Sequence, residues 1–189
     1  MSGTRMLMLG AVRIFQPVHG YFVRRELLSW RADQWANLNP GSVYNALGRL
    51  TKEGYLDSED PGDGKLRYSL TTEGEAEFIN LVREALWRVD SFGPGELMAA
   101  LGFAGALTRE EVIAAMEGRI DQLKSIAGET KFRGQTVVAD PDTPDIVIEQ
   151  FKYVGELQQA QRRFAEAFAQ RVRDGGYVFA GEEVLDKDK

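Results

Sequence analysis

Apolar and polar positions recur with a helical period between Asn39 and Gly54. One face is apolar at positions i, i+3, i+4 and i+7, which are Val43, Ala46, Leu47 and Leu50. The opposite face carries only hydrogen-bonding and cationic side chains, namely Ser42, Tyr44, Asn45, Arg49 and Lys52. Asn39 is a good N-cap, and Pro40 suits a first helical turn. The pattern predicts a short amphipathic helix over residues 40–53.

A β-hairpin pattern follows this helix. Residues 55–60 are typical of a short strand, and Pro61 to Gly64 is rich in turn-forming residues. Residues 65–70 alternate polar and apolar, as expected of a half-buried strand. Leu66, Tyr68 and Leu70 share one predicted face, while the other face is basic and polar, with Lys65, Arg67 and Ser69.

Two further helices are predicted before this segment. Residues 5–15 and 21–31 are rich in apolar residues, and Gln16 to Gly20 separates them. Three helices followed by a hairpin, within about 70 residues, form the order of a winged helix-turn-helix domain. In such a domain the third helix enters a DNA groove and the hairpin, or wing, lies against the sugar-phosphate backbone.

The remaining residues show helical periodicity without a chemical motif. Capping boxes are predicted at Thr72–Glu75 and Thr108–Glu111. The predicted elements are a connecting helix at about 72–92, a short helix with a connector at 96–107, a long helix at about 108–131, a loop with a short extended piece at 134–142, and a long helix at about 143–173.

These patterns predict a mainly α fold with a small β-hairpin wing and two domains. Residues 1–75 are expected to form the winged helix-turn-helix domain, and residues 76–189 an α-helical dimerisation and effector domain. The heptad-like apolar stripes of the two long helices favour pairing with a second copy. An intramolecular helical hairpin is the alternative.

Composition and charge narrow the class of protein. The 189 residues are 43% hydrophobic and contain no cysteine, which excludes disulfides and thiolate metal sites. No apolar run is long enough to span a membrane, and the first residues lack a signal-peptide core, which predicts a cytoplasmic protein. The net charge is −6, but residues 1–70 carry +2 and residues 71–189 carry −8. A mildly basic N-terminal half is compatible with DNA binding.

Candidate catalytic chemistry is sparse. His19 is the sole histidine, and the sequence places no nucleophile and orienting partner beside it. We expect it to cap or bond the turn that opens the second helix. Asp140 and Asp142 lack a neighbouring His or Cys cluster, so we expect solvated caps there. The sequence therefore predicts no catalytic residue, metal site or cofactor, and an enzyme, such as a small hydrolase, is a remote alternative.

The first 75 residues resemble the PadR family of transcriptional regulators. The matching motifs include Leu9-Gly10, His19-Gly20-Tyr21, Pro40-Gly-Ser-Val-Tyr44, Leu47, Leu50, Glu53-Gly54 and Arg67-Tyr68-Ser-Leu-Thr71 with Gly74. Asn45 stands where many relatives have proline. The resemblance implies a homodimeric winged-helix repressor that binds a palindromic double-stranded operator and responds to a small aromatic or drug-like effector.

The resemblance and the helix pattern together predict specific contacts. We expect seven side chains to contact bases or phosphates of DNA: Ser42, Tyr44, Asn45, Arg49, Lys52, Lys65 and Arg67. Trp87 is the effector candidate because it leaves the apolar stripe of the connecting helix, although an aromatic residue at helical spacing can equally be core. A winged-helix protein–protein interaction module without DNA binding is the main alternative.

Overall fold

The computed structural model describes residues 2–36, 39–62, 64–90, 95–139 and 144–182. The chain divides into two compact units. The first comprises Met1–Ala85 with Gly95–Ala104, and the second comprises Leu86–Pro94 with Gly105–Lys189. No helix among the described residues is both long and apolar enough to cross a membrane. The fold is mainly helical with one small antiparallel sheet, as the sequence predicted.

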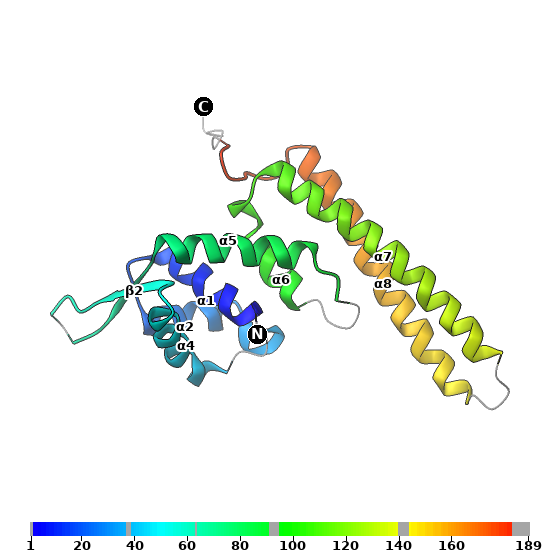
Figure 1. The fold of residues 1–189 in the computed structure, drawn as a ribbon, viewed down its shortest axis with the longest axis horizontal. Coiled ribbons are helices and arrows are strands. Elements are labelled where there is room, and N and C mark those ends of the chain that lie inside the picture. Colours follow the sequence, from blue (N-terminus) through cyan, green and yellow to red (C-terminus); the bar gives the residue numbers. More distant parts are fainter. Residues whose placement is uncertain (1, 37–38, 63, 91–94, 140–143, 183–189) are drawn as a thin grey trace. The chain divides into compact units, whose positions relative to one another are not determined.

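Helix α1 (Ser2–Phe15) forms the centre of the first unit (Figure 1). It contacts α2, α4, α6 and strand β3, and its residues Met6 to Leu9 are each at most 1% exposed. A helix covered on so many sides has little polar surface over these residues, which explains the run of consecutive apolar side chains.

The helix-turn-helix follows α1. It consists of α2 (Gly20–Ser29), a short α3 (Ala32–Trp35), the 3-10 turn η1 (Pro40–Ser42) and α4 (Val43–Lys52). The predicted apolar face of α4 is confirmed, since Val43, Ala46, Leu47 and Leu50 are all buried. The α-helix begins three residues later than predicted, at Val43. The Asn39 side chain accepts a hydrogen bond from the Gly41 N–H at 2.9 Å, so it caps the 3-10 turn instead.

Three strands form the sheet in the order β1-β3-β2, with antiparallel pairing throughout. Strands β2 (Leu56–Glu59) and β3 (Arg67–Leu70) make the predicted wing, and β1 (Val18–His19) joins its other edge. The sequence did not indicate β1, because two residues are too few to show an alternating pattern. Leu66 lies outside β3 and is 48% exposed, so the predicted apolar face of this strand was wrong at that position.

Helix α5 (Thr72–Trp87) and α6 (Gly95–Gly102) extend the first unit beyond residue 75, where the sequence placed the domain boundary. Phe78 of α5 is fully buried and meets Phe103 edge-on, with ring centroids 5.3 Å apart. The predicted capping box at Thr72 was wrong, because the Thr71 hydroxyl accepts the Gly74 N–H at 2.9 Å and Gly74 has no side chain to complete a box. Helix α5 ends at Trp87, before the predicted end at 92, which itself lies outside the described residues.

The second unit is built on α7 (Arg109–Val138) and α8 (Asp145–Arg173), which lie side by side along most of their length (Figure 1). The capping box at Thr108 and Glu111 is confirmed. The predicted loop and extended piece at 134–142 were wrong up to Val138, since α7 continues to that residue. A connector turn, η2 (Ala104–Ala106), precedes α7.

Two arginines fix the ends of this second unit. Arg119, which is 1% exposed, donates hydrogen bonds to the carbonyls of Leu86 and Arg88 at the end of α5, and burial lowers its pKa. Arg109 forms a bidentate pair with Glu182 at 2.6 and 2.9 Å and lies over the Phe179 ring. Glu182 is therefore held in place, and residues 183–189 lie outside the described part.

Candidate nucleic-acid interface

The outward face of α4 presents the side chains that the sequence assigned to DNA. Tyr44, Asn45, Arg49 and Lys52 are exposed, with Tyr44 at 49%. The burial of the opposite face orients this one, because a single amphipathic helix has only one apolar stripe. A Cβ added at Gly48 would meet no heavy atom within 4 Å. Among the described residues, nothing therefore covers the middle of this helix.

Tyr44 is positioned by the start of α2. A Cβ at Gly20 would lie 3.1 Å from Tyr44 Cε1, so the ring rests against a backbone that only glycine leaves bare. Tyr44 also lies near enough to Tyr68 to raise the pKa of that hydroxyl, although burial of Tyr68 is the larger cause. The Tyr44 ring thus rests on the start of α2 while half of its surface remains exposed.

Ser42 is less available than the sequence suggested. Its hydroxyl donates to the Asn39 carbonyl at 2.7 Å, and the residue is half-buried in η1. The hydroxyl proton is therefore already used in a hydrogen bond within the turn. The oxygen can still accept a hydrogen bond, but a phosphate needs donors.

The carboxylate of Glu53 lies beside Arg49 and pairs with it only weakly. The Arg49 Nε lies 3.8 Å from Glu53 Oε1, and the Arg49 side chain is 65% exposed. Glu53 also bonds the Arg5 guanidinium through its other oxygen. Because Arg5 already neutralises Glu53, Arg49 keeps most of its charge for an external partner.

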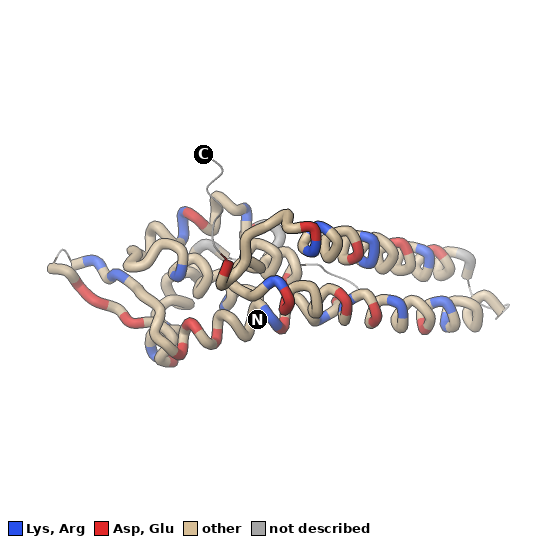
Figure 2. The backbone as a smooth tube through the Cα atoms, turned by 90° about the horizontal axis from the view of Figure 1, so that it is seen from above, with Lys and Arg blue, Asp and Glu red and all other residues tan. Residues whose placement is uncertain are grey.

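The wing is basic along one strand and acidic along the other (Figure 2). Lys65 precedes β3 and Arg67 lies within it, while β2 carries the exposed carboxylates of Asp57 and Glu59. Asp60 shapes the turn, accepting the N–H groups of Gly62 at 2.9 Å and Gly64 at 3.1 Å. The basic strand β3 can therefore bind a phosphate favourably only if the acidic strand β2 is turned away from that phosphate.

His19 connects β1 to this wing. Arg67 Nε donates to His19 Nε2 at 3.3 Å, and His19 Nδ1 lies 3.2 Å from the Leu66 carbonyl. Because Nε2 accepts from Arg67, Nδ1 is the ring nitrogen that can donate to the Leu66 carbonyl. His19 occupies the N-cap position of α2 but makes no side-chain capping bond there, so the capping part of its expected structural role was wrong, and its side chain bonds the wing instead. Since β1 was not predicted, the pairing of His19 with Arg67 could not be predicted either.

Tyr21 is an exposed aromatic residue that the sequence did not assign to the interface. It is 61% exposed at the second position of α2, next to the glycine that supports Tyr44. Its phenol can donate to a phosphate. Its neighbour Phe22 is covered by the Arg25 guanidinium, 3.7 Å from the ring centroid.

Trp87, the effector candidate, lies at the end of α5 and is 40% exposed. Its ring rests on Gly118 of α7, where an added Cβ would lie 2.0 Å from Trp87 Cζ3. Gln122 donates to the Trp87 carbonyl at 3.2 Å. One side of the indole is therefore covered by α7, and its contact with an effector stays a prediction.

Metal chemistry finds no support in the described part of the chain. No three His, Asp or Glu side chains gather there in a way that could hold a metal ion. The single histidine is engaged by the wing.

Helices α1 to α4, a three-stranded sheet and an exposed polar face on α4 define residues up to about 70 as a winged helix-turn-helix domain. Residues 8–80 match the family model described as the transcriptional regulator PadR-like family. The resemblance found in the sequence motifs is thereby confirmed over residues 8–80, which are similar to the PadR-like family of transcriptional regulators. No curated protein matches the chain in sequence.

Solved structures of PadR regulators are similar to this chain at low identity. Bacillus subtilis PadR in complex with operator DNA is 19% identical, with 89% of this chain and 98% of that chain covered and a TM-score of 0.38. The same protein in complex with p-coumaric acid is 18% identical, with 89% and 94% covered and a TM-score of 0.38. A PadR-like regulator from Bacillus cereus is 13% identical, with 90% and 98% covered and a TM-score of 0.39. At such low scores, these likenesses say nothing about the site or the ligands of this chain.

Proposed function

We propose that this chain is a sequence-specific DNA-binding transcriptional regulator that inserts α4 into the major groove. The observation that carries the proposal is the outward face of α4, where exposed Asn45 and Arg49 flank a glycine whose surroundings are open. The family match over residues 8–80 supports it, since the family consists of transcriptional regulators and not of enzymes.

Each side chain has a role that its chemistry suits. Asn45 can bond an adenine edge and Arg49 a guanine edge, each bidentately. Tyr44 and Lys52 suit phosphates at the borders of the groove, where they fix the register of the helix. Lys65 and Arg67 on the wing suit the neighbouring phosphates. Ser42 is a weaker candidate, because its proton is already committed to the Asn39 carbonyl.

The regulator acts as a homodimer in this proposal. A single α4 reads only a few base pairs, and a two-fold pair of such helices reads a palindrome. The α7–α8 pair supplies candidate dimer surface, because large apolar side chains remain exposed there: Phe132 at 71%, Ile146 at 72% and Tyr153 at 65%. We further propose that the protein represses its target and is released by a small aromatic or drug-like effector.

The test is a gel shift with the DNA upstream of the protein's own gene. We expect a retarded band at low salt that weakens as salt rises, because phosphate contacts release counterions. The variant Arg49→Ala should lose this band, whereas Lys124→Ala should keep it, since Lys124 is an exposed lysine of α7 outside the interface. Absence of any shift at low salt for the wild-type chain would reject the proposal.

The acidic edge of the wing favours a second candidate, a winged-helix module that binds another protein. Asp57 and Glu59 are exposed on β2, and carboxylates repel a phosphate backbone. The gel shift separates the two candidates, because a protein-binding module gives no band with DNA.

A further inference from the structure

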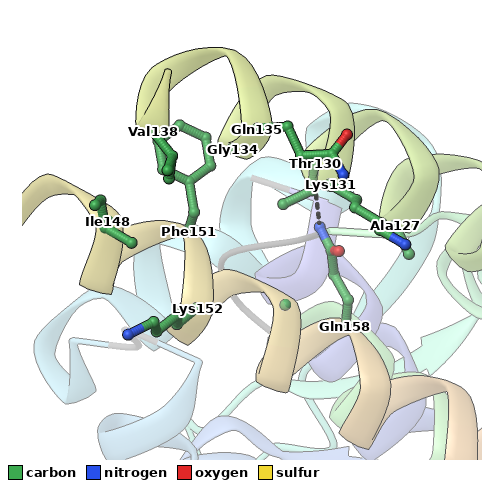
Figure 3. A pocket seen from close by; sticks show the side chains of 11 residues that line it. Ala127, Thr130, Lys131, Gly134, Gln135, Val138, Ile148, Phe151, Lys152 and Gln158 are labelled. Carbon is green, nitrogen blue, oxygen red and sulfur yellow. Dashed lines mark hydrogen bonds between the residues drawn. The ribbon is translucent and has the colours of Figure 1, made fainter. Parts of the chain in front are cut away.

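Among the described residues, the cleft between α7 and α8 has no buried polar group that a ligand can reach. Its volume is about 490 Å³, and its lining is mostly apolar (Figure 3). Gln158, the buried amide of that lining, is 2% exposed and donates to the Thr130 hydroxyl at 3.0 Å. Nothing in the structure shows what covers this cleft. Polar groups that can recognise a ligand lie instead in the first unit, at the edge of the wing.

The bond between Arg67 and His19 leaves most of the arginine unused. Arg67 Nε donates to His19 Nε2 at 3.3 Å, and this is the one side-chain bond that Arg67 makes within the described ranges. The acceptor is an imidazole nitrogen, which carries no negative charge, so the guanidinium keeps its full positive charge. The two terminal nitrogens of Arg67 therefore remain available for the oxygens of an external anion.

The sheet register places three side chains in one row. His19 of β1 and Glu59 of β2 are the cross-strand partners of Arg67 on its two sides. Directly opposed residues of an antiparallel pair point to the same face of the sheet, so Arg67 has a possible acceptor on each side. Arg67 bonds His19, and Glu59 forms no ion pair with any residue that the structure describes. Arg67 is therefore held toward the histidine and away from the acidic strand.

Among the described residues, Arg67 is the one charged side chain that bonds the His19 ring. Other charged or titratable side chains lie on the neighbouring elements without bonding this ring: Asp57 and Glu59 on β2, Lys65 before β3, Tyr68 on β3, and Tyr21 and Arg24 on α2. His19 is the sole histidine and the chain has no cysteine. It is therefore the one side chain of a type that ordinarily titrates between about pH 5 and pH 8.

We propose that His19 and Arg67 form a phosphate site in the wing, and that binding of the DNA backbone there adds a proton to His19. The proton comes from solvent and binds Nε2, while Nδ1 keeps its own proton and still donates to the Leu66 carbonyl. Nε2 then donates to the phosphate that Arg67 binds, and Arg67 Nε turns from the imidazole to a phosphate oxygen. The proposal rests on the proposed function, because DNA supplies the phosphate.

Proton uptake sets the direction of the pH dependence. A bound phosphate favours the charged form of histidine and separates it from the charge of Arg67, so the complex binds more protons than the free protein. Affinity for DNA should therefore rise as the pH falls through the range in which histidine titrates, near pH 6.5. The gain is present at low pH and is lost when the pH is high enough to deprotonate the imidazole in the complex.

The test measures the affinity of the full-length protein for the DNA upstream of its own gene, at constant ionic strength and at about pH 5.5 and about pH 8. Fluorescence anisotropy gives the affinity. We expect binding to be roughly three- to tenfold tighter at the lower pH for each wing that contacts the duplex, as one additional charge-assisted hydrogen bond implies. His19→Gln cannot take up the proton, so its affinities at the two pH values should agree within about twofold.

Glu59→Gln is the matched control for this pH dependence. Protonation of a wing carboxylate would also strengthen DNA binding at low pH, and Glu59 is the carboxylate beside Arg67 in the sheet. The variant removes that carboxylate and leaves His19 in place, so it should keep the gain at low pH. Circular dichroism should show that both variants remain folded.

A second measurement uses no DNA and separates this site from the proposed function. His19 is the sole histidine, so one imidazole signal in the NMR spectrum follows its titration directly. Sulfate has the tetrahedral oxygens of a phosphate but does not itself titrate in this range. We expect sulfate to move the midpoint of the His19 titration to higher pH than chloride does at equal ionic strength. The effect should be smaller in Arg67→Leu, which lacks the guanidinium.

Two results with DNA would overturn the proposal. The first is equal affinity of the wild type at both pH values, and the second is a gain at low pH that persists in His19→Gln. If the wild type binds no DNA at either pH, the proposed function fails and the sulfate titration decides on the site. An unchanged midpoint then rejects the site, and a raised midpoint that requires Arg67 supports it with a phosphate from another source.

Discussion

Glu53 governs how much of the Arg49 charge is available for an external partner. Its carboxylate lies between two guanidinium groups, with Arg5 bonded directly and Arg49 Nε at 3.8 Å. Arg5 also approaches Glu77 at 3.6 Å and lies over the Tyr55 ring, 4.7 Å from its centroid. Arg5 is therefore anchored in the first unit, and the exposed Arg49 can leave Glu53 at little cost in free energy.

Replacing Arg49 should change base preference, whereas replacing Lys65 should not. Arg49→Ala is expected to cost about 1–3 kcal/mol of operator affinity and to relax the preference at one base position, because a bidentate contact to a base edge is lost. Tyr44→Phe should show the same pattern only if its hydroxyl reaches a base. Lys65→Ala should weaken all sequences alike and lower the salt slope by about one.

The measurement for this pair is a titration of the operator and of single-base variants at several salt concentrations. Equal losses on every sequence for Arg49→Ala and Lys65→Ala alike would contradict direct reading of bases by α4.

His19 should act on DNA through Arg67. His19→Leu removes the acceptor for Arg67 Nε and the contact with the Leu66 carbonyl. We expect it to lower operator affinity, and a double-mutant cycle with Arg67→Ala should give a coupling of roughly 0.5–1.5 kcal/mol. Additive effects of the two changes, with both variants folded, would show that His19 only supports the fold.

At the scale of elements, α4 combines a well-packed inner face with a destabilising residue in its centre. Gly48 lowers helix stability by roughly 0.5–1 kcal/mol relative to alanine. No packing within the chain requires it, since its Cβ position is open among the described residues. Gly74 of α5 is the opposite case, because a Cβ there would lie 1.9 Å from the Tyr55 carbonyl oxygen. One glycine is required by the fold, and the other is open to a partner.

Gly48→Ala should therefore separate stability from binding. We expect the free energy of unfolding to rise by roughly 0.5–1 kcal/mol, because alanine favours the helix. Operator affinity should fall, because the added methyl group stands where the backbone approaches DNA. Urea unfolding and a gel shift measure the two effects. Gly74→Ala is the contrasting variant and should lose stability.

A rise in both stability and operator affinity for Gly48→Ala would mean that the middle of α4 stays away from DNA.

Local patterns predicted those elements whose stabilising interactions are close in sequence. The buried face of α4 and the capping box at Thr108 follow from spacings of three or four residues. Strand β1 exists only because β3, nearly fifty residues later, pairs with it. The end of α7 was placed too early because Gly134 and β-branched Val137 and Val138 disfavour a helix by local propensity, yet α7 continues through all three residues.

In the candidate site, too, features that depend on nearby residues were predicted and those that depend on distant residues were not. The exposed positions of α4 were predicted from helical period alone. The pairs Arg5–Glu53 and His19–Arg67 join residues 48 apart, so no local pattern could reveal them. These long-range pairs decide how much of each cation an external phosphate meets.

At the scale of the whole molecule, charge is divided along the chain. Residues 1–70 carry +2 and residues 71–189 carry −8. Figure 2 shows cationic and anionic residues interspersed along both α7 and α8. If α4 and the wing bind DNA as proposed, the acidic remainder should repel DNA and limit non-specific binding.

The pair between Arg109 and Glu182 should make the C-terminal segment sensitive to acid. The hydrogen bond from Arg109 lowers the pKa of Glu182, so the folded chain stabilises the ionised carboxylate. This stabilisation is present above the ordinary Glu pKa and is lost as the pH falls through the lowered value. Glu182→Gln should therefore reduce the free energy of unfolding at pH 7 and have a smaller effect near pH 3, as urea unfolding can measure. An effect of equal size at both pH values would mean that the charge of Glu182 does not matter.

Dimerisation through the α7–α8 pair is the prediction on which the function of the whole molecule depends. Phe132 and Ile146 are each more than two-thirds exposed, and burying two such side chains per copy favours association by several kcal/mol in total, at about 1.5–3 kcal/mol for each full burial. The double variant Phe132→Glu, Ile146→Glu should therefore be monomeric in sedimentation and should bind a palindromic operator no more tightly than a half-site. Lys124→Glu on the same helix as Phe132 is the control and should remain dimeric.

A wild-type dimer that can bind DNA should place its two Tyr44 residues about 34 Å apart, which is one turn of the double helix. If the double variant is still a dimer, the dimer interface lies elsewhere on the chain. The two copies would then be related by a different two-fold axis when they bind a palindrome.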